Sequence, residues 1–141
     1  MLFKPWRIPE KGRPFEKLLR DAEVKNGIPK NMLARVAYQE SRFRDDIISG
    51  RTVSSANAQG IMQLVPRWHP DVNPLDPSEA IPYAGAYLKR LYNRFGSWNE
   101  ALAAYNWGEG NLNKWLKGGT APMPKETTDY VTQIMGDIFR V

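Results

Sequence analysis

The stretch "VAYQESRF", residues 36–43, places a carboxylate, Glu40, at the end of an apolar helical run. The positions three, four and seven residues before this glutamate hold Ala37, Val36 and Leu33. These spacings put all four side chains on one face of a helix. Because burying an ionised carboxylate is costly, a glutamate on such a face needs a partner, a proton or a chemical task.

Two physical effects predict that the pKa of Glu40 is raised. Its apolar neighbours would desolvate the carboxylate, and the C-terminal end of a helix carries partial negative charge. A carboxylic acid that stays protonated near neutral pH can donate a proton to a leaving oxygen, as glycosidases do. The alternative is that Glu40 turns outward at the helix end and pairs with Arg42 or Arg44. The local pattern leaves both interpretations open.

Composition sets broad limits on function. The 141 residues suit one globular domain, and 42% hydrophobic with 25% charged residues argues against disorder. The absence of cysteine excludes disulfides and thiolate zinc sites, and the single histidine, His69, stands among prolines, where we expect a loop residue without a catalytic role. No metal or cofactor is therefore expected. The net charge of +5 favours an anionic partner but does not choose among nucleic acid, membrane and cell-wall polymer.

The chain divides into an irregular N-terminal arm, residues 1–13, and a helical domain, residues 14–141. Proline, cap residues and terminal glycines predict helices at 14–26, from 29 to about 41, and at 58–65, 77–95, 98–107, 112–116 and 126–139. Residues 42–57 read as a loop, and no convincing period-2 strand is present. The predicted class is all-α, with about six or seven helices.

Two segments between these helices carry polar groups beside apolar ones. In "NAQGIMQLVP", residues 57–66, Gly60 permits close backbone approach, and the amide of Gln63 suits sugar hydroxyls and N-acetyl groups. In "AAYNWG", residues 103–108, Tyr105 lies on the packed side of its helix with a hydroxyl that needs a polar partner. Taken alone, the apolar neighbours of Gln63 could be plain core residues, and Asn106 could be only a helix C-cap.

A third segment, "PKETTDYV", residues 124–131, opens the last helix. Thr127 or Thr128 can cap it, and Tyr130 shares a face with Ile134 and Ile138.

Taken in order, "ES", "GIMQ", "AYN" and "ETTDYV" resemble the soluble lytic transglycosylase (SLT) family over residues 15–135. The resemblance implies a goose-lysozyme-like, all-α single domain. It also implies that Glu40 acts as the sole acid and base, cleaving the β-1,4 bond between N-acetylmuramic acid and N-acetylglucosamine in peptidoglycan. The product implied is 1,6-anhydromuramic acid rather than a hydrolysed end.

The same resemblance implies roles for further residues. Ser41 packs beneath the glutamate, and Tyr130 lies close enough to tune it. The remaining positions implied to bind substrate are Gly60, Met62, Gln63, Tyr105 and Asn106. The family's substrate-contacting serine falls on Ser49 when counted forward from Glu40 and on Ser54 when counted back from Gly60; we prefer Ser54, because "RTVSS" resembles an insertion.

Two other functions compete with this interpretation. A lysozyme-type hydrolase shares the fold, and Asp45 or Asp46 could position its water. A non-catalytic basic module binding cell wall or nucleic acid would explain the charge, but Lys and Arg are scattered rather than clustered on one helix.

The N-terminus lacks the apolar core of a secretory signal, and no stretch approaches a membrane span. We therefore expect a monomeric, phage-borne enzyme, located in a virion or the host cytoplasm and acting on the periplasmic wall. Its expected partner is the peptidoglycan glycan strand, with neither nucleic acid nor membrane as a partner.

Overall fold

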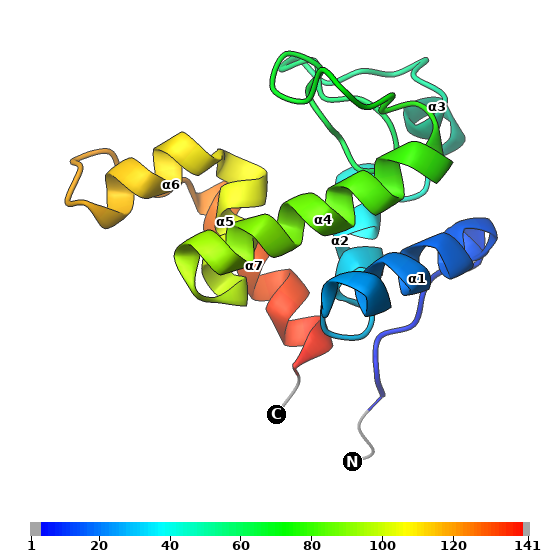
Figure 1. The fold of residues 1–141 in the computed structure, drawn as a ribbon, viewed down its shortest axis with the longest axis horizontal. Coiled ribbons are helices and arrows are strands. Elements are labelled where there is room, and N and C mark those ends of the chain that lie inside the picture. The colour runs from blue at the N-terminus through cyan, green and yellow to red at the C-terminus, as the bar shows by residue number, and fades with distance from the viewer. Residues whose placement is uncertain (1–3, 140–141) are drawn as a thin grey trace.

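The computed structural model describes residues 4–139, which contain seven α-helices and one 3-10 helix, η1 (Figure 1). Their bounds are η1 Glu10–Phe15, α1 Glu16–Asn26, α2 Met32–Ser41, α3 Asp45–Ile48, α4 Pro77–Phe95, α5 Trp98–Trp107, α6 Glu109–Leu116 and α7 Lys125–Ile138. Within residues 4–139 the β structure is limited to one isolated antiparallel bridge, between Gln59 and Leu64. The predicted all-α class is confirmed.

Helix α2 runs through the centre of the molecule and packs against α1 and α7. Its residues 32–37 are all buried. A side chain from α1 closes its N-terminus, because the Glu23 carboxylate accepts hydrogen bonds from the backbone N–H of Asn31 at 3.0 Å and of Ala34 at 3.1 Å. The first four N–H groups of a helix lack intrahelical partners, so this buried carboxylate satisfies two of them and fixes the start of α2.

The local cap signals are confirmed where they are strongest. Helix α4 begins at Pro77, and the Asp76 carboxylate accepts a hydrogen bond from the Ser78 N–H at 2.9 Å. Helix α5 follows Ser97, whose hydroxyl accepts from the Glu100 N–H at 3.1 Å. The link between the two helices is Gly96, whose φ of 88° lies in the left-handed region that favours glycine.

The prediction of a helix at residues 58–65 is wrong. The structure has a tight turn there, held by the Gln59–Leu64 bridge, with positive φ at Gly60 (78°) and Gln63 (51°). A Cβ at position 60 would lie 1.8 Å from the Pro74 carbonyl oxygen. Glycine is therefore required there both by its φ and by the close approach of another chain segment.

Other boundaries shift. The second helix begins at Met32 rather than at Pro29, and the region predicted as loop contains the short helix α3. Neither Thr127 nor Thr128 caps α7, because the cap position is Pro124 and both threonines lie within the helix.

The described part of the N-terminal arm packs on the same core as the helical domain. Trp6 and Ile8 are partly buried against it. Gly12 is buried in η1 so closely against Phe43 that an added Cβ would lie 2.5 Å from a ring carbon. The boundary at residue 13 stays a prediction. No helix among residues 4–139 combines the length and the apolar character needed to cross a bilayer.

Candidate active site

Glu40 lies in the last turn of α2, partly exposed, and faces α7. The hydroxyl of Tyr130, a residue 3% exposed, donates a hydrogen bond to Glu40 Oε2 at 2.8 Å. Tyr130 shares the buried face of α7 with Ile134, as its spacing predicted. The contact joins the first and the last of the four sequence motifs.

Desolvation raises the pKa of Glu40 to about 8, while the hydrogen bond from Tyr130 lowers it and the negative charge of Glu126 raises it further. With that pKa, the carboxyl group is mainly protonated at pH 7. The alternative in which Glu40 pairs with an arginine is contradicted. Arg44 binds Asp46 at 2.8 Å, and the Arg42 guanidinium lies 4.5 Å from the centre of the Tyr38 ring.

Tyr105 joins α5 to the turn at residues 57–66. Its hydroxyl donates to the carbonyl oxygen of buried Met62 at 2.8 Å. Burial raises the pKa of Tyr105 well above its usual value, and the negative charge of Glu40 adds to the effect. Within the turn, Gln63 Nε2 donates to the Gly60 carbonyl at 2.9 Å, so the amide nitrogen is held. The motifs "ES", "GIMQ" and "AYN" thus meet around Tyr105.

The side chain of Asn106 makes a bond beyond its own helix. Thr127 Oγ1, on α7, donates to Asn106 Oδ1 at 2.8 Å, and Thr127 is only 1% exposed. The alternative that Asn106 serves only as a helix C-cap is therefore wrong, because its side chain joins α5 to α7. Sequence reasoning missed this role of Thr127, because the two residues are 21 positions apart and lie on different helices.

The three serines lie in different environments. Ser41 is fully buried; its hydroxyl donates to the Ala37 carbonyl at 2.9 Å and accepts from the Phe43 N–H at 3.2 Å. Ser54 is exposed and accepts from the Ala58 N–H at 2.9 Å. Ser49 is exposed near α3. Which of them contacts substrate stays a prediction, and the placement of Ser41 suits packing beneath Glu40.

The acidic residues considered for positioning a hydrolytic water lie on α3. Asp46 accepts hydrogen bonds from Arg44 at 2.8 Å and from Thr52 Oγ1 at 2.7 Å. These bonds hold the pKa of Asp46 below its usual value. Asp45 is exposed at the start of the same short helix.

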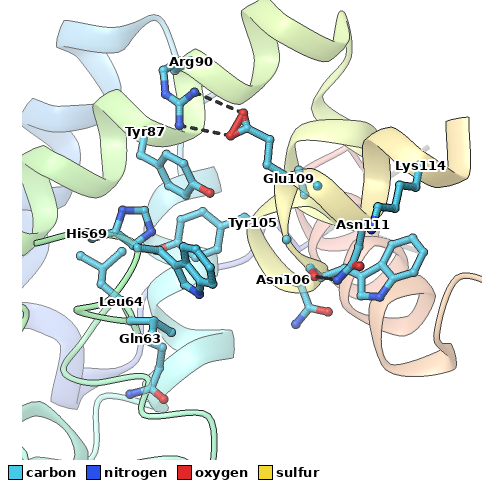
Figure 2. A pocket seen from close by; sticks show the side chains of 16 residues that line it. Gln63, Leu64, His69, Tyr87, Arg90, Tyr105, Asn106, Glu109, Asn111 and Lys114 are labelled. Atoms are coloured by element: carbon cyan, nitrogen blue, oxygen red, sulfur yellow. Dashed lines mark hydrogen bonds and ion pairs between the residues drawn. The ribbon is translucent and has the colours of Figure 1, made fainter. Parts of the chain in front are cut away.

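A pocket of about 580 Å³ opens beside these motifs and is lined by Gln63, Tyr105 and Asn106. In Figure 2, Gln63 and Tyr105 lie on one side of it, and Asn106 lies on the other. Glu40 is not one of the lining residues.

The wall of this pocket contains residues that the sequence motifs did not identify. His69 Nδ1 lies 2.6 Å from the Tyr83 hydroxyl, and its ring packs edge-on against Tyr87. The loop histidine of the sequence analysis thus has a structural place in the pocket wall. No cluster of His, Cys, Asp or Glu able to hold a metal ion occurs among residues 4–139.

Comparison with known proteins gives the decisive match. Residues 17–127 match the family model described as "Transglycosylase SLT domain". The chain belongs to this family.

Three relatives agree with the family. The chain is 30% identical to the membrane-bound lytic murein transglycosylase F of Stutzerimonas stutzeri, over 72% of this chain and 25% of that protein. It is 31% identical to the protein of the same name from Alcanivorax borkumensis, over 70% of this chain and 22% of that protein. It is also 30% identical to the peptidoglycan transglycosylase gp16 of Escherichia phage T7, over 86% of this chain and 10% of that protein. The chain thus spans a quarter or less of each of these relatives.

Proposed function

We propose that this SLT-family chain is a peptidoglycan lytic transglycosylase in which Glu40 is the single acid and base. The observation that carries the proposal is the environment of Glu40. The carboxyl group has a pKa of about 8, accepts a hydrogen bond from Tyr130, and lies close to the motifs that line a large pocket.

The first step uses the protonated carboxyl group. Glu40 donates its proton to the oxygen between N-acetylmuramic acid and N-acetylglucosamine, the glycosidic bond breaks, and positive charge develops at the anomeric carbon. The acetamido oxygen of the substrate stabilises that charge. Glu40 is now a carboxylate, and the Tyr130 hydroxyl, already 2.8 Å away, stabilises it by a charge-assisted hydrogen bond.

In the second step the muramyl C6 hydroxyl attacks the anomeric carbon. Glu40 takes the proton of that hydroxyl, the 1,6-anhydro bond forms, and the carboxyl group returns to its starting state. One residue performs both transfers, which favours a pKa near the operating pH.

The motif residues supply substrate contacts in this proposal. Because the amide nitrogen of Gln63 is bound to the Gly60 carbonyl, its oxygen is presented as an acceptor for a sugar hydroxyl or an amide N–H. Because Thr127 donates to the Asn106 oxygen, the NH₂ group of Asn106 is left as a donor at the pocket wall. That donor suits the carbonyl of an N-acetyl group.

The similarity to a protein of phage T7 supports a phage origin. We further propose that the domain acts as a monomer on the cell wall, delivered by a virion or released late in infection. Nucleic acid and membrane are not partners in this proposal.

The test is mass spectrometry of the fragments released from purified peptidoglycan. Fragments ending in 1,6-anhydromuramic acid, one water lighter than reducing ends, are expected from the wild type and not from Glu40→Gln. The matched control is Glu16→Gln, which makes the same chemical change on the exposed side of α1. Reducing ends alone would establish a lysozyme-type hydrolase. Undiminished release by Glu40→Gln would overturn the assignment of Glu40.

A further inference from the structure

The pocket continues beyond Tyr105 to a region between α4 and α6 that the four motifs do not reach. Arg90 and Tyr87, from α4, line one side of it, and Glu109 and Lys114, from α6, line the other. In Figure 2 the Arg90–Glu109 ion pair links the two sides at the end opposite Gln63.

This region carries more positive than negative charge. Arg90 binds both oxygens of Glu109, at 3.2 and 3.3 Å, and Arg94, which does not itself line the pocket, binds the same carboxylate from behind the wall. Glu109 is the one acidic residue among the described residues that line the pocket. Two guanidinium groups therefore share one carboxylate. Lys114, five residues after Glu109 on α6, adds a third positive charge.

The region is also rich in hydrogen-bond donors. Burial raises the pKa of Tyr87 to about 12, so its hydroxyl stays protonated at neutral pH. Arg90 uses one N–H of each terminal nitrogen on Glu109 and retains others, since a guanidinium has five. Lys114 contributes an ammonium group that is exposed at the wall.

Neutral N-acetylhexosamines do not require such a charge excess, because their hydroxyl and acetamido groups are satisfied by amides such as Gln63 and Asn106. In peptidoglycan the carboxylates are carried by the lactyl arm of muramic acid. They belong either to the stem peptide attached to that arm or to the lactyl group itself once the peptide has been removed.

We propose that the α4–α6 end of the pocket, formed by Tyr87, Arg90 and Lys114, binds a carboxylate on the lactyl arm of a muramic acid located away from the cleavage point. The proposal rests on the proposed function, and it assigns to this end of the pocket the selection of muramic acid over glucosamine.

The experiment measures binding rather than turnover, using Glu40→Gln so that ligands are not consumed. Calorimetry compares three tetrasaccharides: a peptidoglycan fragment with stem peptides, the same fragment after amidase treatment, which leaves free lactyl carboxylates, and chitotetraose, which has no lactyl arm. We expect chitotetraose to bind at least about tenfold more weakly than the tighter of the other two ligands, because it has no carboxylate that could form charge-assisted hydrogen bonds. Which of the two carboxylated ligands binds tighter identifies the source of the carboxylate. Equal affinity for all three ligands would overturn the proposal.

The second comparison removes one charge. Lys114→Met, in the Glu40→Gln background, should weaken the binding of the tighter carboxylated tetrasaccharide about three- to fivefold. The affinity for chitotetraose should not change. Lys117→Met is the matched control, because Lys117 is exposed just after α6 and does not line the pocket. An equal loss for all ligands, or an equal effect of the two lysine variants, would contradict a carboxylate site. These readouts stay informative if the wild type proves to hydrolyse the wall, so failure of the proposed chemistry and failure of this site are distinguishable.

Discussion

Replacing Glu40 by glutamine should stabilise the protein, and by an amount that grows with pH. The pKa of Glu40 is raised from 4.5 to about 8 in the folded state. At pH values between these two pKa values, Glu40 keeps its proton in the folded protein but has lost it in the unfolded chain. The free energy of unfolding therefore falls as the pH rises. The slope is at most about 1.4 kcal/mol per pH unit, and the loss at pH 7 is up to about 3 kcal/mol. Glutamine carries no charge to desolvate and escapes this loss.

The assay is urea unfolding of the wild type and Glu40→Gln at intervals from about pH 4 to about pH 8. The two free energies of unfolding should be similar below pH 4.5 and diverge steadily above it, with the variant more stable. Glu16→Gln should follow the wild type in parallel at every pH, because that carboxylate is exposed. A gap between wild type and Glu40→Gln that does not change with pH would refute the desolvated state of Glu40.

Three other substitutions test contacts in the site. Thr127→Val should lower kcat/KM about fivefold in a peptidoglycan digestion assay, since Asn106 loses one orienting hydrogen bond, and Thr127→Ser should restore it. Gly60→Ala should lower stability by about 3 kcal/mol or more, measured as a fall in Tm, because the new Cβ meets the Pro74 carbonyl; an unchanged Tm would refute the contact. Tyr130→Phe removes a bond that lowers the pKa of the Glu40 carboxyl, so the basic limb of the pH–rate profile should move to higher pH and the maximal rate should fall. A basic limb that stays in place would contradict that last reasoning.

The parts of the fold that sequence predicted are those set by local chemistry. Asp76 caps the start of α4, Gly96 ends that helix, and Ser97 caps α5. Each acts on atoms within four residues of itself, so the boundary between α4 and α5 could be predicted from the sequence. The side-chain spacing around Glu40 likewise placed it at the end of a buried helical face.

The parts that sequence missed depend on contacts between distant segments. Ile61, Met62 and Leu64 have apolar spacing that a helix or a buried turn can both satisfy. The choice is made by Gly60, whose backbone lies against Pro74, a residue with no sequence signal linking it to the turn. The pocket wall on α6 was missed for a related reason, because Glu109 acquires its partners Arg90 and Arg94 only through the packing of two helices.

The distance between Glu40 and Tyr130 is held by a second tie between the same two helices. Arg35, 5% exposed on α2, binds Asp137 on α7 at 2.7 Å. Arg35 precedes Glu40 whereas Asp137 follows Tyr130, so the helices run antiparallel and the two contacts lie about 7–11 Å apart along them. Two ties at that spacing restrict both sliding and rotation of α7 against α2.

Breaking this ion pair, in which the Arg35 side chain is buried and that of Asp137 is 26% exposed, should therefore affect chemistry as well as stability. Arg35→Met is expected to cost about 2 kcal/mol of unfolding free energy and to lower kcat at a temperature where the variant is fully folded. Lys17→Met is the control, because it breaks the Lys17–Asp21 ion pair on the exposed face of α1 and should change neither quantity measurably. An Arg35→Met protein that is less stable but retains the full kcat would show that the contact between Glu40 and Tyr130 is positioned without the second tie.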